Sequence, residues 1–189
     1  MTATIDRMTV SERVTSPPAR LCLTPAGSVP GLLDGAWWPR SRDLSRELPA
    51  LIDVLDACWG RITRVAVNPA HWPVIPHKVP MAGHTVHVGW FADEQDPHKL
   101  ILLSYTAGRW DLLVIPPETG AAAAARLMSA AAAPGELATA SGLMASEDIA
   151  RDARETLNRE EEWETDGGHP SVAADNPNPP GPMSSARGK

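Results

Sequence analysis

The sequence predicts an α+β domain in which an antiparallel, meander-like sheet of about five strands carries two helices on one face. Short β-branched or alternating segments recur between residues 62 and 115, a pattern typical of neighbouring strands joined by tight turns. Segments with apolar residues at helical spacing lie before and after that region, at 44–59 and 119–133. We expect a single domain over residues 19–135.

The two ends of the chain differ from this domain in composition. Residues 1–18 are polar and end in two prolines, so we expect a flexible leader. Residues 136–164 are expected to hold a peripheral acidic helix, because charged residues dominate its surface. Residues 165–189 are rich in Gly, Pro, Ser and Asn, which predicts a disordered tail that buries almost nothing.

The elements before residue 60 follow from local signals. Arg20 to Thr24 is the first predicted strand. Leu32 to Trp38 places apolar residues on both sides of Asp34-Gly35, a pair that favours a type I′ hairpin turn. A proline inside a helix costs a hydrogen bond, so Pro49 predicts a short turn at 43–47 and a helix from Pro49 to Trp59.

Four further strands are predicted, at residues 62–67, 85–90, 99–105 and 109–115. The last two are expected to form a hairpin around Thr106-Ala107-Gly108. Leu112 to Ile115 is apolar at every position, so its strand should lie inside the sheet. An alanine-rich helix capped by Thr119 is expected to run to about Ala133, and a charged helix to begin near Ser146.

Composition excludes several classes of protein. The net charge of −6 argues against nucleic acid as a partner, because phosphate contacts need clustered cations. No apolar run approaches the roughly 20 residues that span a bilayer, and no basic-then-apolar segment opens the chain. We therefore expect a cytoplasmic protein in which Cys22 and Cys58 stay reduced and pack as small core residues.

One long motif resembles a known family. The segment LDGAWWPRSRDL, from Leu33 to Leu44, resembles a family of uncharacterised actinobacterial proteins known only as a domain of unknown function. The resemblance continues through Ile62-Thr63-Arg64-Val65, Gly89-Trp90-Phe91 and Leu112 to Pro117, and covers about residues 20–133. It implies one compact domain with variable tails, and it implies no reaction, cofactor or catalytic residue.

The double tryptophan is the first part of a candidate site. Seven of the nine aromatic residues are tryptophan, which combines a large apolar body with one N–H that needs a partner. Because neighbours on a strand point to opposite faces, one of Trp37 and Trp38 should enter the core. The other should sit on the outer face or in a groove. The alternative is that both are packed core residues.

The arginines that follow are the second part. Arg40 and Arg42 precede a helix start, where positive charge opposes the helix dipole. They either form ion pairs with Asp34 or Asp43, or they form a site for a carboxylate or phosphate. The candidate site for an anionic small molecule or a protein partner therefore comprises Asp34, Trp37, Trp38, Arg40 and Arg42.

The sequence favours a non-enzymatic binding or regulatory module. One alternative is a small enzyme with its acid-base group among Asp34, His71 and His84. Another is a structural homodimer that buries tryptophans across a two-fold interface. No cofactor or metal is expected: phosphate-loop and nucleophile motifs are missing, and His84 and His87 should face opposite sides of a strand.

Overall fold

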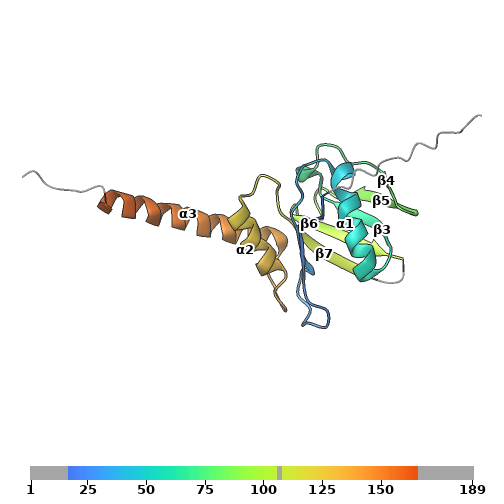
Figure 1. The fold of residues 1–189 in the computed structure, drawn as a ribbon, viewed down its shortest axis with the longest axis horizontal. Helices are drawn as coiled ribbons and strands as arrows, with labels where there is room; N and C mark the ends of the chain where they lie inside the picture. The colour runs from blue at the N-terminus through green and yellow to red at the C-terminus, as the bar shows by residue number, and fades with distance from the viewer. Residues whose placement is uncertain (1–16, 106–107, 166–189) are drawn as a thin grey trace, which may run out of the picture. The chain divides into compact units, whose positions relative to one another are not determined.

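The computed structural model describes residues 17–105 and 108–165, apart from the side chains of residues 161, 162, 164 and 165. The chain divides into two compact units, residues 1–152 and 153–189, and the sheet and the first two helices belong to the first unit (Figure 1). The predicted leader and tail lie almost entirely outside the described residues.

A seven-stranded mixed sheet forms the centre of the first unit, in the order β1-β2-β7-β6-β3-β5-β4. The strands are β1 (Leu21–Leu23), β2 (Gly35–Trp37), β3 (Ile62–Val67), β4 (Lys78–Met81), β5 (His84–Trp90), β6 (Lys99–Ser104) and β7 (Arg109–Val114). The α+β class is confirmed. The purely antiparallel meander of about five strands is wrong, because β2 runs parallel to β7 and β3 runs parallel to β5.

The predicted hairpin turn at Asp34-Gly35 is also wrong, because Gly35 begins strand β2. Gly35 has φ +142°, and a Cβ atom at this position would overlap the carbonyl oxygen of Cys22 on β1. Glycine is therefore needed here for a close approach of two strands rather than for a turn. Asp34 accepts a hydrogen bond from the backbone N–H of Asp111 (2.8 Å), which joins the start of β2 to β7.

Helix α1 runs without a break from Leu44 to Trp59, so the predicted division at Pro49 is wrong. Asp43 caps its start by accepting hydrogen bonds from the backbone N–H groups of Ser45 and Arg46. One face of the helix is fully buried, through Leu44, Leu48, Leu51, Ile52 and Leu55. Cys58 lies outside this buried stripe and is exposed, so the expectation that both cysteines are core residues is wrong for Cys58.

Helices α1 and α2 (Ala121–Ala131) cover opposite faces of the sheet, whereas both were predicted on one face (Figure 1). The reason lies in β7, which is buried on both sides. Leu112 and Val114 belong to the core under α1, and Leu113 and Ile115 belong to the core under α2. A central strand that is apolar at every position needs a cover on each face.

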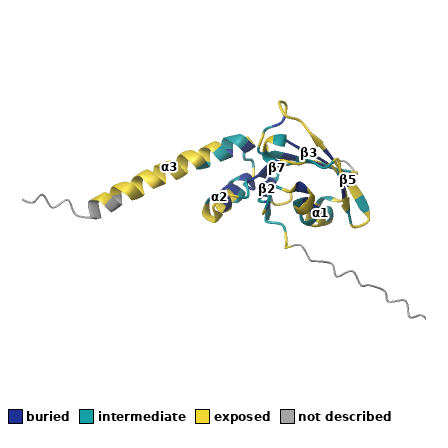
Figure 2. Ribbon diagram, turned by 90° about the horizontal axis from the view of Figure 1, so that it is seen from above, coloured by how far each residue is buried: buried dark blue, intermediate teal, exposed yellow. Residues whose placement is uncertain are grey.

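The two remaining helices are short η1 (Pro69–His71) and long α3 (Ala140–Thr165). Helix α3 begins six residues before the predicted start near Ser146, because Ala140 and Leu143 join the core under α2. Gly120 rather than Thr119 precedes α2, and it provides no side-chain cap. Within the second unit, the side chains of residues 153–160 and of Trp163 are exposed (Figure 2).

Candidate functional site

Trp37 and Trp38 lie on opposite faces of β2 and its extension, as the alternation of a strand predicts. Trp37 is 1% exposed and stacks on Trp72, with ring centroids 5.7 Å apart. Trp38 is half-buried and packs against the core under α2. The guanidinium of Arg20 lies 3.4 Å from the centre of the Trp38 ring. Trp37 is thus closed to a ligand, and one face of Trp38 is already occupied by an arginine.

Arg42 is held by the fold rather than open to a ligand. Its guanidinium forms an ion pair with Glu118 and donates a hydrogen bond to the carbonyl of His71 (3.2 Å). Burial raises the pKa of Glu118, but the hydrogen bond and the positive charge of Arg42 more than offset this, so the pKa lies below its ordinary value. The partner is an acid 76 residues away, not Asp34 or Asp43.

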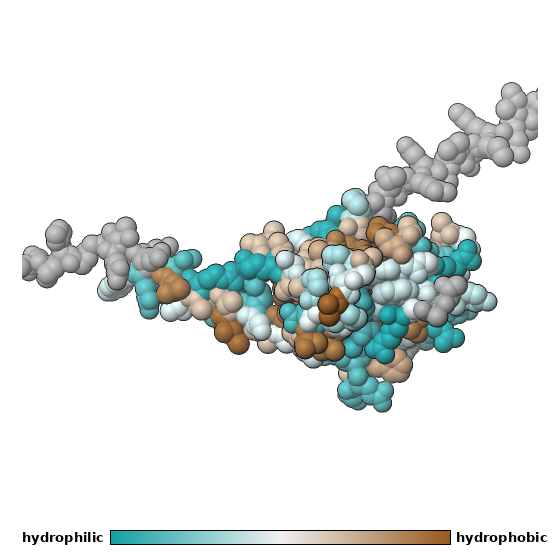
Figure 3. Space-filling view, turned by 90° about the horizontal axis from the view of Figure 1, so that it is seen from below, coloured by the Kyte–Doolittle hydropathy of each residue, from teal (hydrophilic) through white to brown (hydrophobic). Residues whose placement is uncertain are grey.

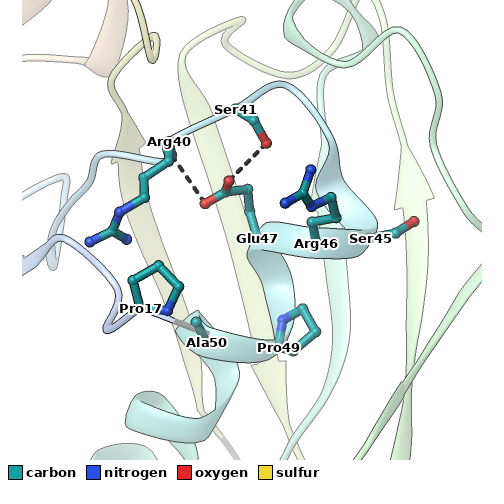
Figure 4. Close-up of a pocket in the computed structure, with 8 residues that line it drawn as sticks. All are labelled: Pro17, Arg40, Ser41, Ser45, Arg46, Glu47, Pro49 and Ala50. Carbon is teal, nitrogen blue, oxygen red and sulfur yellow. Dashed lines mark hydrogen bonds between the residues drawn. The ribbon is translucent and has the colours of Figure 1, made fainter. Parts of the chain in front are cut away.

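Arg40 lines an open hollow beside the start of α1, and this hollow has a volume of about 510 Å³ (Figure 4). Its walls are Pro17, Arg40, Ser41, Ser45, Arg46, Glu47, Pro49 and Ala50. The Glu47 carboxylate accepts hydrogen bonds from the backbone N–H of Arg40 (3.0 Å) and from the Ser41 hydroxyl (2.8 Å). In Figure 4, this carboxylate lies between the side chains of Arg40 and Arg46.

The positive charges around this hollow repel one another. The Arg40 guanidinium donates to the carbonyl of Pro18 (2.8 Å), and Arg20 donates to the carbonyl of Trp38 (2.9 Å). Burial and the nearby charge of Arg40 both lower the pKa of Arg20. Among the described residues, Arg20, Arg40 and Arg46 form no ion pair with a carboxylate. The Glu47 carboxylate has a smaller opposing effect on the pKa of Arg20, and the hollow is lined by one carboxylate and two arginines, Arg40 and Arg46.

A family model matches residues 20–131 of the chain, which include the sheet, α1, α2 and this hollow apart from Pro17. The chain belongs to DUF5994, a family of unknown function. No curated protein and no solved structure matches the chain. The family assignment confirms the resemblance of residues 20–131 to a domain of unknown function, and it adds no chemistry to the geometry of the DUF5994 domain.

The three residues named for an acid-base role lie apart in the DUF5994 domain. Asp34 lies at β2 and bonds the backbone of β7, and burial raises its pKa. His84 lies on β5, with its Nε2 atom 3.0 Å from the carbonyl oxygen of Ile62 and 3.6 Å from the Asp56 carboxylate. His71 lies in η1 beside His98. None of the three contacts another, so they do not form a shared acid-base centre.

The described part of the chain was compared with the requirements of a metal site and of a membrane-spanning helix. Within residues 17–105 and 108–165, no group of three or more His, Cys, Asp or Glu side chains is arranged to hold a metal ion. In the same residues, no helix has both the length and the apolar character needed to cross a bilayer.

Sequence reasoning missed two residues of the hollow region, Arg20 and Arg46. Arg20 was assigned to a strand, and nothing local shows that it would reach the indole of Trp38, 18 residues later. Arg46 carried a usable signal. It lies in the first turn of α1, where a cation opposes the helix dipole just as Arg40 and Arg42 do.

Proposed function

We propose that this DUF5994 protein is a non-enzymatic binding module whose ligand is a small molecule with one anionic group. Arg40 and Arg46 would hold that group in the hollow beside the start of α1. The observation that carries the proposal is that Arg40 and Arg46 both line one hollow and neither forms an ion pair with a carboxylate among the described residues. Guanidinium forks bind carboxylates and phosphates through charge-assisted hydrogen bonds.

Both charges stand where a positive charge is unfavourable, which supports a role in binding. Arg46 lies in the first turn of α1, where a positive charge is unfavourable. Arg40 lowers the pKa of Arg20, so the two guanidinium groups repel each other. A bound anion would relieve both unfavourable interactions. Of the candidate residues named from sequence, Arg40 is the one this proposal places at the ligand.

The lining limits the ligand to a modest charge and size. A volume of about 510 Å³ lies in the range of small-molecule sites. Glu47 lies between the two arginines, so a polyanion would meet a fixed negative charge, whereas a single carboxylate or phosphate group can be oriented away from it. On the face of the molecule drawn in Figure 3, apolar side chains form separate spots rather than one large patch.

The test is titration of the full chain with acetate and with inorganic phosphate, followed by calorimetry or by the shift in melting temperature. We expect one of these anions to bind, and Arg40→Ala combined with Arg46→Ala to weaken that binding at least about tenfold. The comparison between the two anions distinguishes a carboxylate ligand from a phosphate ligand.

Arg61→Ala is the control, because Arg61 is an exposed arginine outside the hollow. It should leave binding within about twofold of the wild-type value, since it changes only the net charge. An equal loss in Arg61→Ala, or retained binding in the double variant, would show that the hollow is not the site.

Two other expectations from the sequence stay predictions. We propose a cytoplasmic location on the basis of two free thiols, Cys22 and Cys58. The homodimer remains an alternative to the binding module, and light scattering at high concentration tests it directly.

A further inference from the structure

A row of basic side chains crosses three neighbouring strands at the end of the sheet away from α2. His87 on β5 is directly opposite Lys78 on β4 and directly opposite Arg64 on β3. Residues in register on neighbouring strands point to the same face of a sheet. All three side chains are exposed, whereas Val65, Val86 and Val88 on the other face lie in the core under α1.

Among the described elements, the helix on this face of the sheet is α2, and it packs at the other end. Helix α2 packs on β1, β2 and β7, while β3, β5 and β4 form the other end of the sheet (Figure 1). In the described part of the chain, Lys78, His87 and Arg64 form no ion pair. The acid farther along the same face, Asp111, is already paired with Lys99 (3.1 Å) and Arg109 (2.9 Å).

The charges of Lys78 and Arg64 lie two strands apart on one face, and no carboxylate in the described part of the chain forms an ion pair with either of them. The remaining residues of this face on the three strands are Pro80, Thr85, Gly89 and Ala66, and none of them is acidic or aromatic. Gly89 and Ala66 are small, so the basic side chains stand clear of their neighbours. These strands thus offer on this face two cations, the Thr85 hydroxyl and the His87 imidazole.

We propose that the row Lys78–His87–Arg64 binds a linear oligophosphate. Neighbouring strands lie about 5 Å apart, so the cations of Lys78 and Arg64 stand about 10 Å apart with the His87 side chain between them in a straight line. A chain of linked phosphates places its negative charges in such a line, whereas a single tetrahedral anion would reach only one of the two cations. Phosphate is recognised by guanidinium forks and by ammonium point charges, and both are present.

The proposal concerns the phosphate chain alone, because Lys78 and Arg64 can contact phosphate groups without any base. Inorganic tripolyphosphate should therefore bind although it carries no base. A single-stranded nucleic acid is the competing ligand. The row spans only about 10 Å, which is too short to follow an extended backbone.

The experiment is calorimetric titration of the full chain with tripolyphosphate at low ionic strength. Arg64→Gln and Lys78→Gln should each weaken binding about tenfold, since each removes one charge-assisted contact. Arg61→Gln removes the same charge three residues before Arg64 and should change affinity less than about twofold. All three positions are exposed, and unchanged urea unfolding will show that the variants remain folded.

Two further measurements distinguish this site from the hollow and distinguish an oligophosphate ligand from a nucleic acid. Arg40→Ala combined with Arg46→Ala should leave tripolyphosphate binding intact, so the proposed function and this inference can fail independently. The proposal is overturned if tripolyphosphate does not bind, if Arg61→Gln weakens binding as much as Arg64→Gln, or if a single-stranded oligonucleotide binds more than about tenfold more tightly than tripolyphosphate.

Discussion

His71 and His98 form a close pair of rings between η1 and the loop before β6, with centroids 4.3 Å apart. The Nε2 atom of His71 and the Nδ1 atom of His98 are both buried, and neither has a hydrogen-bond partner in the described structure. Burial lowers the pKa of His71, and the charges of His98 and Arg42 lower it further, against a smaller opposing effect of Glu118 and Asp96. Folding therefore favours the neutral form of His71.

This pair predicts a loss of stability in mild acid. The pKa of His71 is lower in the folded state than its ordinary value of 6.5, so the unfolded chain binds the proton more readily. The contribution of His71 to stability is then complete above about pH 6.5 and is lost as the pH falls towards the lowered pKa. We expect the free energy of unfolding, measured by urea denaturation, to decrease between about pH 7.5 and pH 5.5, and His71→Gln to reduce that slope.

The exposed His77 provides the matched control, and His77→Gln should keep the wild-type slope. The pKa values of Glu118 and Asp96 lie below their ordinary 4.5 and 3.8, so their stabilising effect is lost only in stronger acid. If His71→Gln shows the same slope as the wild type over this pH range, His71 does not cause the acid sensitivity.

Residue partners across the fold explain why only part of the site was predictable. The opposite orientation of Trp37 and Trp38 follows from the two-residue period of a strand and needs no knowledge of the fold. The partner of Arg42 cannot be predicted in this way. Glu118 lies 76 residues away and comes close only once α1 and β7 are packed together. The pairing of Asp34 with the backbone of β7 is equally non-local.

Helix α1 shows how burial outweighs local propensity within one element. A proline inside a helix costs about 3 kcal/mol, mainly through one lost hydrogen bond and a steric clash. The five buried leucine and isoleucine side chains of α1 each gain roughly 1.5–3 kcal/mol on burial, and Asp43 adds about 1 kcal/mol as the cap. The sum exceeds the cost of Pro49, so the helix continues through it.

Replacing Pro49 should therefore stabilise the protein. Alanine restores a backbone N–H that can reach the carbonyl of Ser45, so Pro49→Ala should raise the free energy of unfolding by roughly 1–2 kcal/mol in urea denaturation. Pro49→Gly restores the same N–H with a poorer helix former, and should gain about 1 kcal/mol less than Pro49→Ala. Equal stability of Pro49→Ala and wild type would mean that the missing hydrogen bond costs α1 nothing.

Strand pairing was the least predictable property of the elements. The alternation in β5 and the β-branched run in β3 identify them as strands, and both are found. Their parallel pairing depends on β4 turning back to the sheet edge, and β4 contains only four residues with a proline among them. An edge strand tolerates a proline because the missing N–H would not have been needed for a second partner strand. The same proline makes the segment hard to recognise as a strand from its sequence.

At the scale of the whole molecule, the mixed sheet has a different cover on each face. Helix α1 closes one face, and α2 with the first residues of α3 closes part of the other, so the uncovered remainder of that face carries the basic row. The sequence shows that β7 must be buried on both sides, yet it does not show which segment supplies the second cover. That cover is completed by Ala140 and Leu143, which lie beyond the expected boundary at residue 135.

The domain limits expected from sequence can be tested by replacing leucine with alanine at two positions of α3. Leu143 is 8% exposed and belongs to the core under α2, whereas Leu157 is 58% exposed. Leu143→Ala should lower the free energy of unfolding by roughly 2–3 kcal/mol, because it removes buried methyl groups and leaves a cavity. Leu157→Ala should lower it by less than about 0.5 kcal/mol. Urea denaturation of both variants decides the matter: equal losses would mean that the folded unit extends past residue 152, and no loss in Leu143→Ala would return its boundary to about residue 135.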